Sequence, residues 1–184
     1  MKFFGDVTQA IETYTKVGSD RCAETLPVRR PGTGELRFSR FSCDRQCYAC
    51  TDAIRIEAEV AKLNSLPRYF ISFLVNNRHG LPILHIDSRL LNMDFSGSEE
   101  CGPISFLITN HRLAQGDYTI NAFICCEGGV VDHIENCASF NIEPKLPYPS
   151  SRSDCASLAV VYPEIAIEVR DKELQDAPRE TARV

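Results

Sequence analysis

The fold is decided between Phe70 and Ile142, where three segments share one pattern: FISFLVNNRHGLPILHIDS (70–88), SFLITNHRLAQGDYTINAFICC (105–126) and VVDHIENCASFNI (130–142). Each segment alternates apolar and polar residues with the two-residue period of a half-buried β-strand. Gly80, and Gly116 with Asp117, interrupt the alternation where the chain can turn. One face of such a sheet fills a core and the other is free to bind. The pattern therefore indicates a binding surface on strands rather than a catalytic cleft.

Similar alternation outside this stretch extends the predicted sheets in both directions. The spacing between strand starts, with turns between them, is typical of an antiparallel β-sandwich. No helical pattern comes between the strands, which argues against a parallel α/β sheet. The sequence therefore predicts an all-β fold with strands at residues 36–38, 54–60, 71–75, 83–86, 104–108, 118–124, 140–142 and, late in the chain, 165–169.

The two ends of the chain differ from this β-rich centre. Residues 1–17 are predicted to end in a short helix, because Asp6 is a good N-cap and Gln9 follows it as in a capping box. Residues 18–34 form a linker whose prolines and glycines prevent regular structure. Residues 35–170 form the β-sandwich domain, and the charged residues 171–184 form a flexible tail. The late strand either returns to its own sheet or pairs with a second subunit, and we favour a homodimer.

Composition limits the classes of function. The chain has 184 residues, enough for one domain with appended arms, and 43% of them are hydrophobic, enough for a sizeable core. Its formal net charge of -5 argues against nucleic acid or an anionic membrane as a partner. The sequence has no apolar run long enough to span a membrane, and its N-terminus is too polar for a secretory signal. We therefore expect a cytoplasmic protein whose nine cysteines are thiols.

One group of cysteines has a spacing that suggests a metal site. Cys43, Cys47 and Cys50 could bind zinc if a fourth ligand came from elsewhere in the chain. No second C-x-x-C pair accompanies them, and their position between two strands favours reduced loop cysteines. The sequence therefore predicts no metal and no cofactor, with structural zinc as the alternative; the candidate fourth ligands are His79, His85 and Cys101.

No pattern in the sequence predicts catalysis. A Cys/His nucleophile pair has no local signature, and neither G-x-S-x-G nor a Walker A pattern occurs. Asp132, His133 and Glu135 suggest a carboxylate-rich metal site, but their position between strands favours a solvated polar hairpin. Cys125 and Cys126 point to opposite faces of a strand, which predicts one core thiol and one surface thiol. We expect a non-catalytic protein.

The order of the segments resembles the C-terminal domain of Wzt-type proteins, the ATP-binding subunits of ABC transporters that export O-antigen polysaccharide. The resemblance covers residues 32–143, most of the chain. It rests on a glycine-rich start to the first strand, a strand-turn-strand element, an "L-x-x-G-x-Y" element and a polar turn. The matching positions are Gly32, Gly34 and Glu35, then Asn77 and Gly80, then Leu113, Gly116 and Tyr118, and finally Val131–Asn136.

The N-terminus carries a second part of this resemblance. FFGDVTQAIETY is similar to the last helix of the family's nucleotide-binding domain, with Gly5, Ala10, Ile11 and Tyr14 at the matching positions. The resemblance implies that the chain is a fragment that begins just inside the ATPase. Such a fragment neither binds nor hydrolyses ATP, although its full-length parent would be an ATPase.

The resemblance also implies a function. The family's domain is an Ig-like β-sandwich that recognises the terminated, lipid-linked O-polysaccharide on the cytoplasmic side of the inner membrane. It couples chain completion to export through the transmembrane subunit of the transporter. The chain departs from expectation in having no tryptophan and in the cysteine-rich loop between Cys43 and Cys50. No set of binding residues carries over by motif.

Candidate binding residues follow instead from strand geometry. If Ile71, Phe73 and Val75 face the core, the residues between them face outward, and the same rule applies to the strand at 118–124. If these strands are neighbours in one sheet, their outward side chains form an exposed patch of amides, hydroxyls, one carboxylate, one imidazole and one aromatic ring. A sugar needs that mixture of groups. The predicted glycan-binding residues are Ser72, Leu74, Asn76, His85, Asp87, Thr119, Asn121, Phe123, Cys125, Ser139 and Asn141.

The alternative is that this face packs against another subunit or the C-terminal arm, since apolar outward residues serve both purposes. The chain would then be a structural dimerisation domain without a glycan ligand. Substitution of Asn121 or Phe123 separates the two hypotheses. It abolishes glycan binding and leaves the dimer intact in the first case, and it weakens the dimer in the second.

Overall fold

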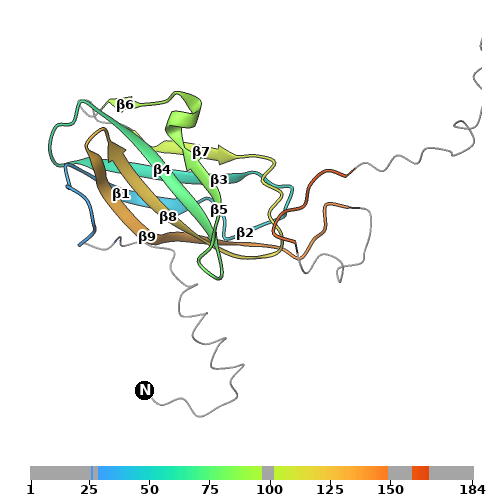
Figure 1. Ribbon diagram of the computed structural model, residues 1–184. Coiled ribbons are helices and arrows are strands. Elements are labelled where there is room, and N and C mark those ends of the chain that lie inside the picture. The colour runs from blue at the N-terminus through green and yellow to red at the C-terminus, as the bar shows by residue number, and fades with distance from the viewer. Residues whose placement is uncertain (1–25, 27–28, 97–101, 149–158, 166–184) are drawn as a thin grey trace, which may run out of the picture.

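The computed structural model of the chain describes residue 26 and residues 29–96, 102–148 and 159–165. In spatial order, the smaller of its two sheets contains β1 (Leu36–Cys43), β3 (Ile54–Lys62) and β7 (Ile104–Ile108). The larger contains β2 (Cys47–Tyr48), β9 (Gly129–Ile142), β8 (Gly116–Cys126), β4 (Arg68–Asn77) and β5 (Pro82–Asp87), with β6 (Phe95–Ser96) paired to β4 (Figure 1). The only helical element among these residues is the 3-10 turn η1 (Ser88–Leu91). The predicted all-β class is confirmed.

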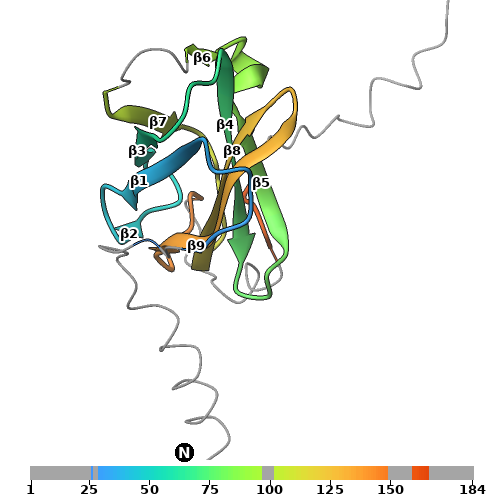
Figure 2. The same ribbon diagram turned by 90° about the vertical axis from the view of Figure 1, so that its left-hand side faces the viewer.

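The two sheets face each other across one core (Figure 2). Phe73 of β4 joins them, because its ring contacts Phe41 of β1 and Phe106 of β7 edge-on, with centroids 5.9 and 5.1 Å apart. Such aromatic contacts stabilise the fold beyond the burial of their area. The predicted inward side of β4 and β8 is confirmed, because its residues are all buried: Ile71, Phe73, Val75, Tyr118, Ile120, Ala122 and Ile124.

The predicted hairpin around Gly80 is also confirmed. β4 and β5 pair antiparallel, and Gly80 adopts a φ of 74°, a conformation that favours glycine. The N–H of Gly80 donates to the carbonyl of Asn77 at 2.9 Å. The Asn77 side-chain oxygen accepts from the N–H groups of His79 and Leu81, at 2.9 and 3.0 Å. Asn77 therefore closes the turn with its side chain, as asparagine commonly does.

The segment around Asp132 corrects a prediction. Asp132, His133 and Glu135 lie inside the long strand β9 and do not form a solvated hairpin. Asp132 is fully buried, and its carboxylate contacts Nε of Arg30 at 3.2 Å and Nη1 of Arg37 at 2.6 Å. It also accepts from a backbone N–H of β1 at 2.9 Å. The prediction was wrong because the charged partners that make this burial tolerable come from a distant part of the chain.

Residues 30–34, which we call the clamp, lie along β9. Their backbone contacts are Thr33 N–H to the carbonyl of Val130 at 3.2 Å, Gly34 N–H to Val131 at 2.9 Å, and His133 N–H to Pro31 at 3.1 Å. Gly32 has a φ of 115°, and a Cβ at this position would overlap the carbonyl of Val131. The clamp and the Asp132 ion pairs together fix this stretch of chain to β9.

The predictions for the chain ends fall mostly outside the described residues. The helix at 6–17 lies outside them, as does the late strand apart from Ile165. The described stretch 159–165 returns to the body of the protein, where Val161 forms an antiparallel bridge with Leu113. Tyr162 is buried in the core at this point.

Candidate functional site

The side of the larger sheet that faces away from the core, which we call the outer face, aligns its residues in rows across four strands. Cross-strand register defines a first row of Asp87, Ser72, Phe123 and His133. The second row is His85, Leu74 and Asn121. The third is Asn76, Thr119 and Ser139. Side chains in such rows lie within reach of one another.

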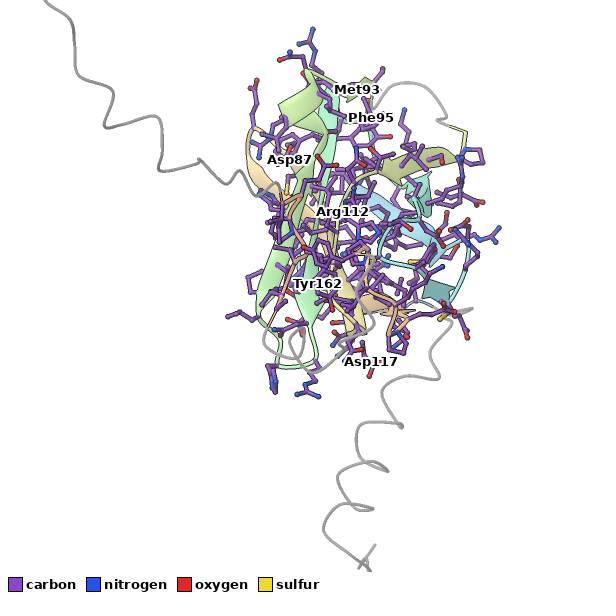
Figure 3. All side chains as sticks on the ribbon, turned by 90° about the vertical axis from the view of Figure 1, so that its right-hand side faces the viewer. Asp87, Met93, Phe95, Arg112, Asp117 and Tyr162 are labelled. Carbon is purple, nitrogen blue, oxygen red and sulfur yellow. The ribbon has the colours of Figure 1, made fainter. Side chains whose placement is uncertain are left out.

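Two further pairs lie at the ends of these rows. Cys125 pairs with Phe70 at one end, and Asn141 pairs with Asp117 at the other. Figure 3 shows Asp87 and Asp117 toward opposite ends of the molecule. The structure thus brings all of the residues proposed from the sequence onto four neighbouring strands, β5, β4, β8 and β9.

The expected exposure of this patch is wrong for three residues. Ser72, Asn76 and Asp87 are only 7%, 5% and 4% exposed. Ser72 Oγ lies 3.0 Å from Nε2 of His85, and the side chain of Arg89 lies against Asp87. Neighbouring side chains therefore cover Ser72 and Asp87, which strand alternation alone does not reveal.

Phe123 and His133 form a parallel stack at the centre of the first row. Their ring centroids are 4.3 Å apart and their planes differ by 9°. Because each ring covers one face of the other, the half-buried Phe123 can offer a ligand only the part of its ring that the stack leaves exposed. Nε2 of His133 is buried and has no hydrogen-bond partner among the described residues.

Two of the predicted amides already have structural partners. Asn121 Oδ1 accepts from the N–H of Asn136 at 2.9 Å, at a bulge where Asn136 has a φ of 50°. Asn141 Nδ2 donates to Asp117 Oδ1 at 2.8 Å. Asn121 therefore has its Nδ2 group and the second lone pair of Oδ1 left for a ligand. Like Nε2 of His133 and Nδ2 of Asn121, the Thr119 and Ser139 hydroxyls and the Asn76 amide show no side-chain hydrogen bond among the described residues.

Arg89 completes the end of the outer face beside β5. Its guanidinium carbon lies 3.7 Å from the centre of the Phe70 ring. Nε and Nη2 of Arg89 donate to the two carboxylate oxygens of Asp87, at 3.0 and 2.7 Å. These side-chain hydrogen bonds lower the pKa of Asp87, and the backbone N–H of Arg89 adds to the effect. The carboxylate is therefore charged and held in place at neutral pH.

Sequence reasoning missed Phe70, His133 and Arg89. Phe70 has the same parity as Ser72, and His133 has the same parity as Ser139, so a longer alternation would have found both. For Arg89 the only signal was Asp87 at the N-cap position of a turn, because strand parity does not fix the direction of a side chain beyond the strand end.

The cysteines form no metal cluster within the described residues, where groups of three or more His, Cys, Asp or Glu suited to a metal do not occur. Cys43, Cys47 and Cys50 are free thiols, of which Cys50 is buried and Cys47 exposed. Cys126 packs against the core and Cys125 lies on the outer face, as predicted, but both thiols are half-buried. Burial raises the pKa of the Cys125 thiol, so it is protonated at neutral pH.

None of the helical segments in the described part of the chain has the length and apolar character that a bilayer crossing requires.

Comparison with known proteins places this fold. The model of the Wzt C-terminal domain family matches residues 29–158, more than half of the chain. The chain belongs to this family. A search of curated proteins finds no match.

The solved structure of the C-terminal domain of wzt is similar to the chain, with a TM-score of 0.60 and 11% sequence identity over 77% of this chain and 88% of that one. An alkylpurine DNA glycosylase, AlkC from Pseudomonas fluorescens bound to DNA containing an abasic site analogue, gives a TM-score of 0.42 at 7% identity, over 61% of this chain and 31% of that one. A CARDB domain from Pyrococcus furiosus in complex with di-metal ions gives 0.37 at 17% identity, over 66% and 98%. The last two likenesses carry no argument about this domain.

Proposed function

We propose that the outer face of this Wzt C-terminal domain binds the terminated, lipid-linked O-antigen polysaccharide and couples it to export by an ABC transporter. The observation that supports the proposal most directly is the set of polar rows that crosses β5, β4, β8 and β9 in a member of this family. In this proposal the domain is an Ig-like, non-catalytic module of residues 35–170, attached through the linker to an ATP-binding subunit. It works as a homodimer on the cytoplasmic side of the inner membrane, beside the transmembrane subunit.

The chemistry of the outer face suits a sugar chain. The hydroxyls of Thr119 and Ser139 both donate and accept, and Nδ2 of Asn121 donates, so they can pair with sugar hydroxyls. The exposed part of the half-buried Phe123 ring can pack against the C–H surface of a sugar ring. Because successive rows follow one another along the strands, the outer face fits a linear chain of several sugars better than a single one. The proposed ligand therefore lies along the sheet and contacts several rows.

Binding of the purified chain to the O-chain of its own source, with and without the terminal modification, tests the proposal. Thr119→Val and Ser139→Ala remove hydroxyls from the third row. Each is expected to raise the dissociation constant about fivefold, the value of one hydrogen bond of about 1 kcal/mol. Ser39→Ala is the matched control, because Ser39 is an exposed residue of β1 in the smaller sheet. Equal binding by all variants, or no binding of the terminated chain, rejects the proposal.

A structural dimerisation domain is the second candidate function. Its support is the cluster of exposed apolar side chains after β5, where Leu90, Leu91 and Met93 are 71%, 70% and 51% exposed. Apolar side chains gathered in this way often contact a partner. If this function is correct, Leu90→Ser with Leu91→Ser converts a dimer to a monomer in analytical ultracentrifugation, while the O-chain does not bind even the wild type.

A further inference from the structure

Arg89 uses only part of its hydrogen-bonding capacity. A guanidinium has two edges that each present a pair of parallel N–H groups, one formed by Nε with Nη2 and the other by Nη1 with Nη2. Asp87 occupies the first edge, with distances of 3.0 and 2.7 Å. Among the described residues, the side-chain hydrogen bonds of Arg89 use Nε and Nη2, and Nη1 has no acceptor. The second edge is therefore open, and the Arg89 side chain is 56% exposed.

The open edge has a fixed position on the outer face. Asp87 is 4% exposed and caps η1 through the N–H of Arg89, so it holds the guanidinium from a rigid site. The ring of Phe70 supports the guanidinium from below, 3.7 Å from its carbon. Phe70 pairs with Cys125, one row from Phe123. A chain that lies along the strands and crosses the rows thus reaches Phe70 and Arg89, at the end of the outer face where β5 ends.

The chemistry of this edge selects its ligand. Two parallel N–H donors match two oxygen atoms of one group, as in a carboxylate or a phosphate. The edge has no acceptor, and Asp87 is too buried to supply one to a ligand. The group that binds here must therefore supply the acceptor oxygens itself.

We propose that the β5 end of the outer face binds a carboxylate or phosphate substituent of the polysaccharide through the open edge of Arg89. This inference rests on the proposed function, since the substituent is part of the glycan. Arg89 is then a specificity residue, which distinguishes a chain carrying an acidic group at this position from a neutral one.

Local charge indicates that geometry, more than net charge, governs this recognition. Arg89 is paired with Asp87, and the neighbouring Arg68 lies 3.9 Å from Asp94. The region thus has balanced charges, and an acidic group gains little from long-range attraction. Lysine at position 89 would keep the positive charge but lose the paired donors, so a substitution by lysine separates the two contributions.

The test uses the full chain and the O-chain of its own source in three forms: native, carboxyl-reduced to primary alcohols, and dephosphorylated with hydrofluoric acid. The wild type is expected to bind the native form and to lose about tenfold in affinity for one treated form, the value of a charge-assisted pair of hydrogen bonds. Which treatment weakens binding distinguishes a carboxylate from a phosphate.

Arg89→Lys is expected to bind the native form about tenfold more weakly than the wild type and to bind the native and treated forms equally. Arg68→Lys is the matched control, since Arg68 is 79% exposed at the same end of β4 and is expected to bind like the wild type. Thermal unfolding verifies that both variants are folded. The comparison of native and treated O-chains needs only the wild-type protein, so it tests the proposal even if a variant does not fold.

Unchanged affinity of the wild type for both treated forms overturns the inference, as does wild-type affinity in Arg89→Lys. In these outcomes the proposed glycan function stands. Absence of binding to every form, by contrast, rejects the proposed function itself.

Discussion

Gly32 sits where the clamp comes closest to β9. Its φ of 115° is unfavourable for residues with a side chain, and a Cβ would overlap the carbonyl of Val131. The atoms that this Cβ would meet are all backbone atoms of Val131 and Asp132, which cannot move aside as a flexible side chain can. The glycine is therefore required by the contact itself and not merely by a turn.

Gly32→Ala is expected to lower the free energy of unfolding by about 3 kcal/mol, the sum of backbone strain and steric overlap. Gly80→Ala is the control, because Gly80 also has a positive φ but has no atom within 4 Å of the added Cβ. It is expected to cost about 1 kcal/mol, the strain alone. Urea titration measures both values, and equal losses would contradict the overlap at Gly32.

His111 gives the fold a sensitivity to acid. It is 7% exposed, and its Nδ1 accepts from the N–H of Leu113 at 3.0 Å. Burial lowers the pKa of the imidazole below its ordinary value of 6.5, because the charged form is poorly solvated there. The unfolded chain therefore takes up the proton first, so stability is fully present above pH 6.5 and falls as the pH drops through the lowered pKa.

His111→Asn is expected to remove this part of the acid sensitivity. The asparagine oxygen can accept the same N–H from two residues on, as in an Asx-turn, while the titrating group is lost. Melting temperatures between about pH 7.5 and about pH 5, a range that extends further below the ordinary histidine pKa than above it, provide the measurement. A wild type that falls no more steeply than the variant would exclude His111 as a source of the effect.

At the scale of elements, β9 depends on the charges buried beneath it. Asp132 has no exposure, and it balances both Arg30 from the clamp and Arg37 from β1. A buried ion pair that loses one partner leaves an uncompensated charge, which costs more than the pair contributes.

Asp132→Asn is therefore expected to lower the free energy of unfolding by about 3–5 kcal/mol. Asp94→Asn removes a carboxylate whose ion pair with Arg68 is exposed, and it is expected to cost about 0.5 kcal/mol or less. Guanidinium chloride would screen these charges, so urea titration is the appropriate measurement. A loss of less than about 1 kcal/mol in Asp132→Asn would contradict this expectation, since it would mean that the two arginines are solvated well enough without the carboxylate.

Regular strands were the elements that the sequence predicted well. In β4 and β8 every second residue is apolar and buried, so parity assigned the core correctly, but it did not show that Ser72 and Asn76 are covered on the outer face. β9 was harder, because Asp132 and His133 interrupt its apolar pattern and two extra residues bulge out between Ile134 and Ala138 opposite β8. Local polarity cannot show that a charge is buried, since that depends on partners such as Arg30.

The candidate site was predictable only as far as strand parity extends. Parity placed Thr119, Ser139 and Phe123 on one face, but it could not show that His133 stacks on Phe123. It also could not place Arg89, which follows β5 and bends back over Phe70. These features arise from side-chain contacts between strands, and they are fixed only once the sheet is assembled.

At the scale of the whole molecule, one aromatic chain connects the two sheets. The middle ring of this chain is Phe73 of β4. It contacts Phe41 of β1 edge-on on one side and Phe106 of β7 edge-on on the other. Neither sheet can therefore lose its packing without exposing the core of the other. This arrangement is expected to make the described part of the chain unfold as one unit.

Phe73→Leu is expected to lower the free energy of unfolding by about 1–3 kcal/mol while the transition stays single. Near-ultraviolet and far-ultraviolet circular dichroism should give coincident urea curves for both the wild type and the variant. Ile83→Val is the control for a lost methylene at a half-buried position of β5. Curves that separate in the wild type would show that the sheets unfold independently.

The attachment of the clamp has a mechanical consequence. A pull on the chain ahead of residue 30 meets three backbone hydrogen bonds and the buried Asp132 contacts before it reaches β1. The load therefore enters the larger sheet through β9, the strand that carries His133, Ser139 and Asn141 on the outer face. Displacement of the preceding segment is expected to slide β9 along β8, which would move the paired residues of each row out of register. The surface on which we propose that the glycan lies is thus the one that tension on the chain would distort first.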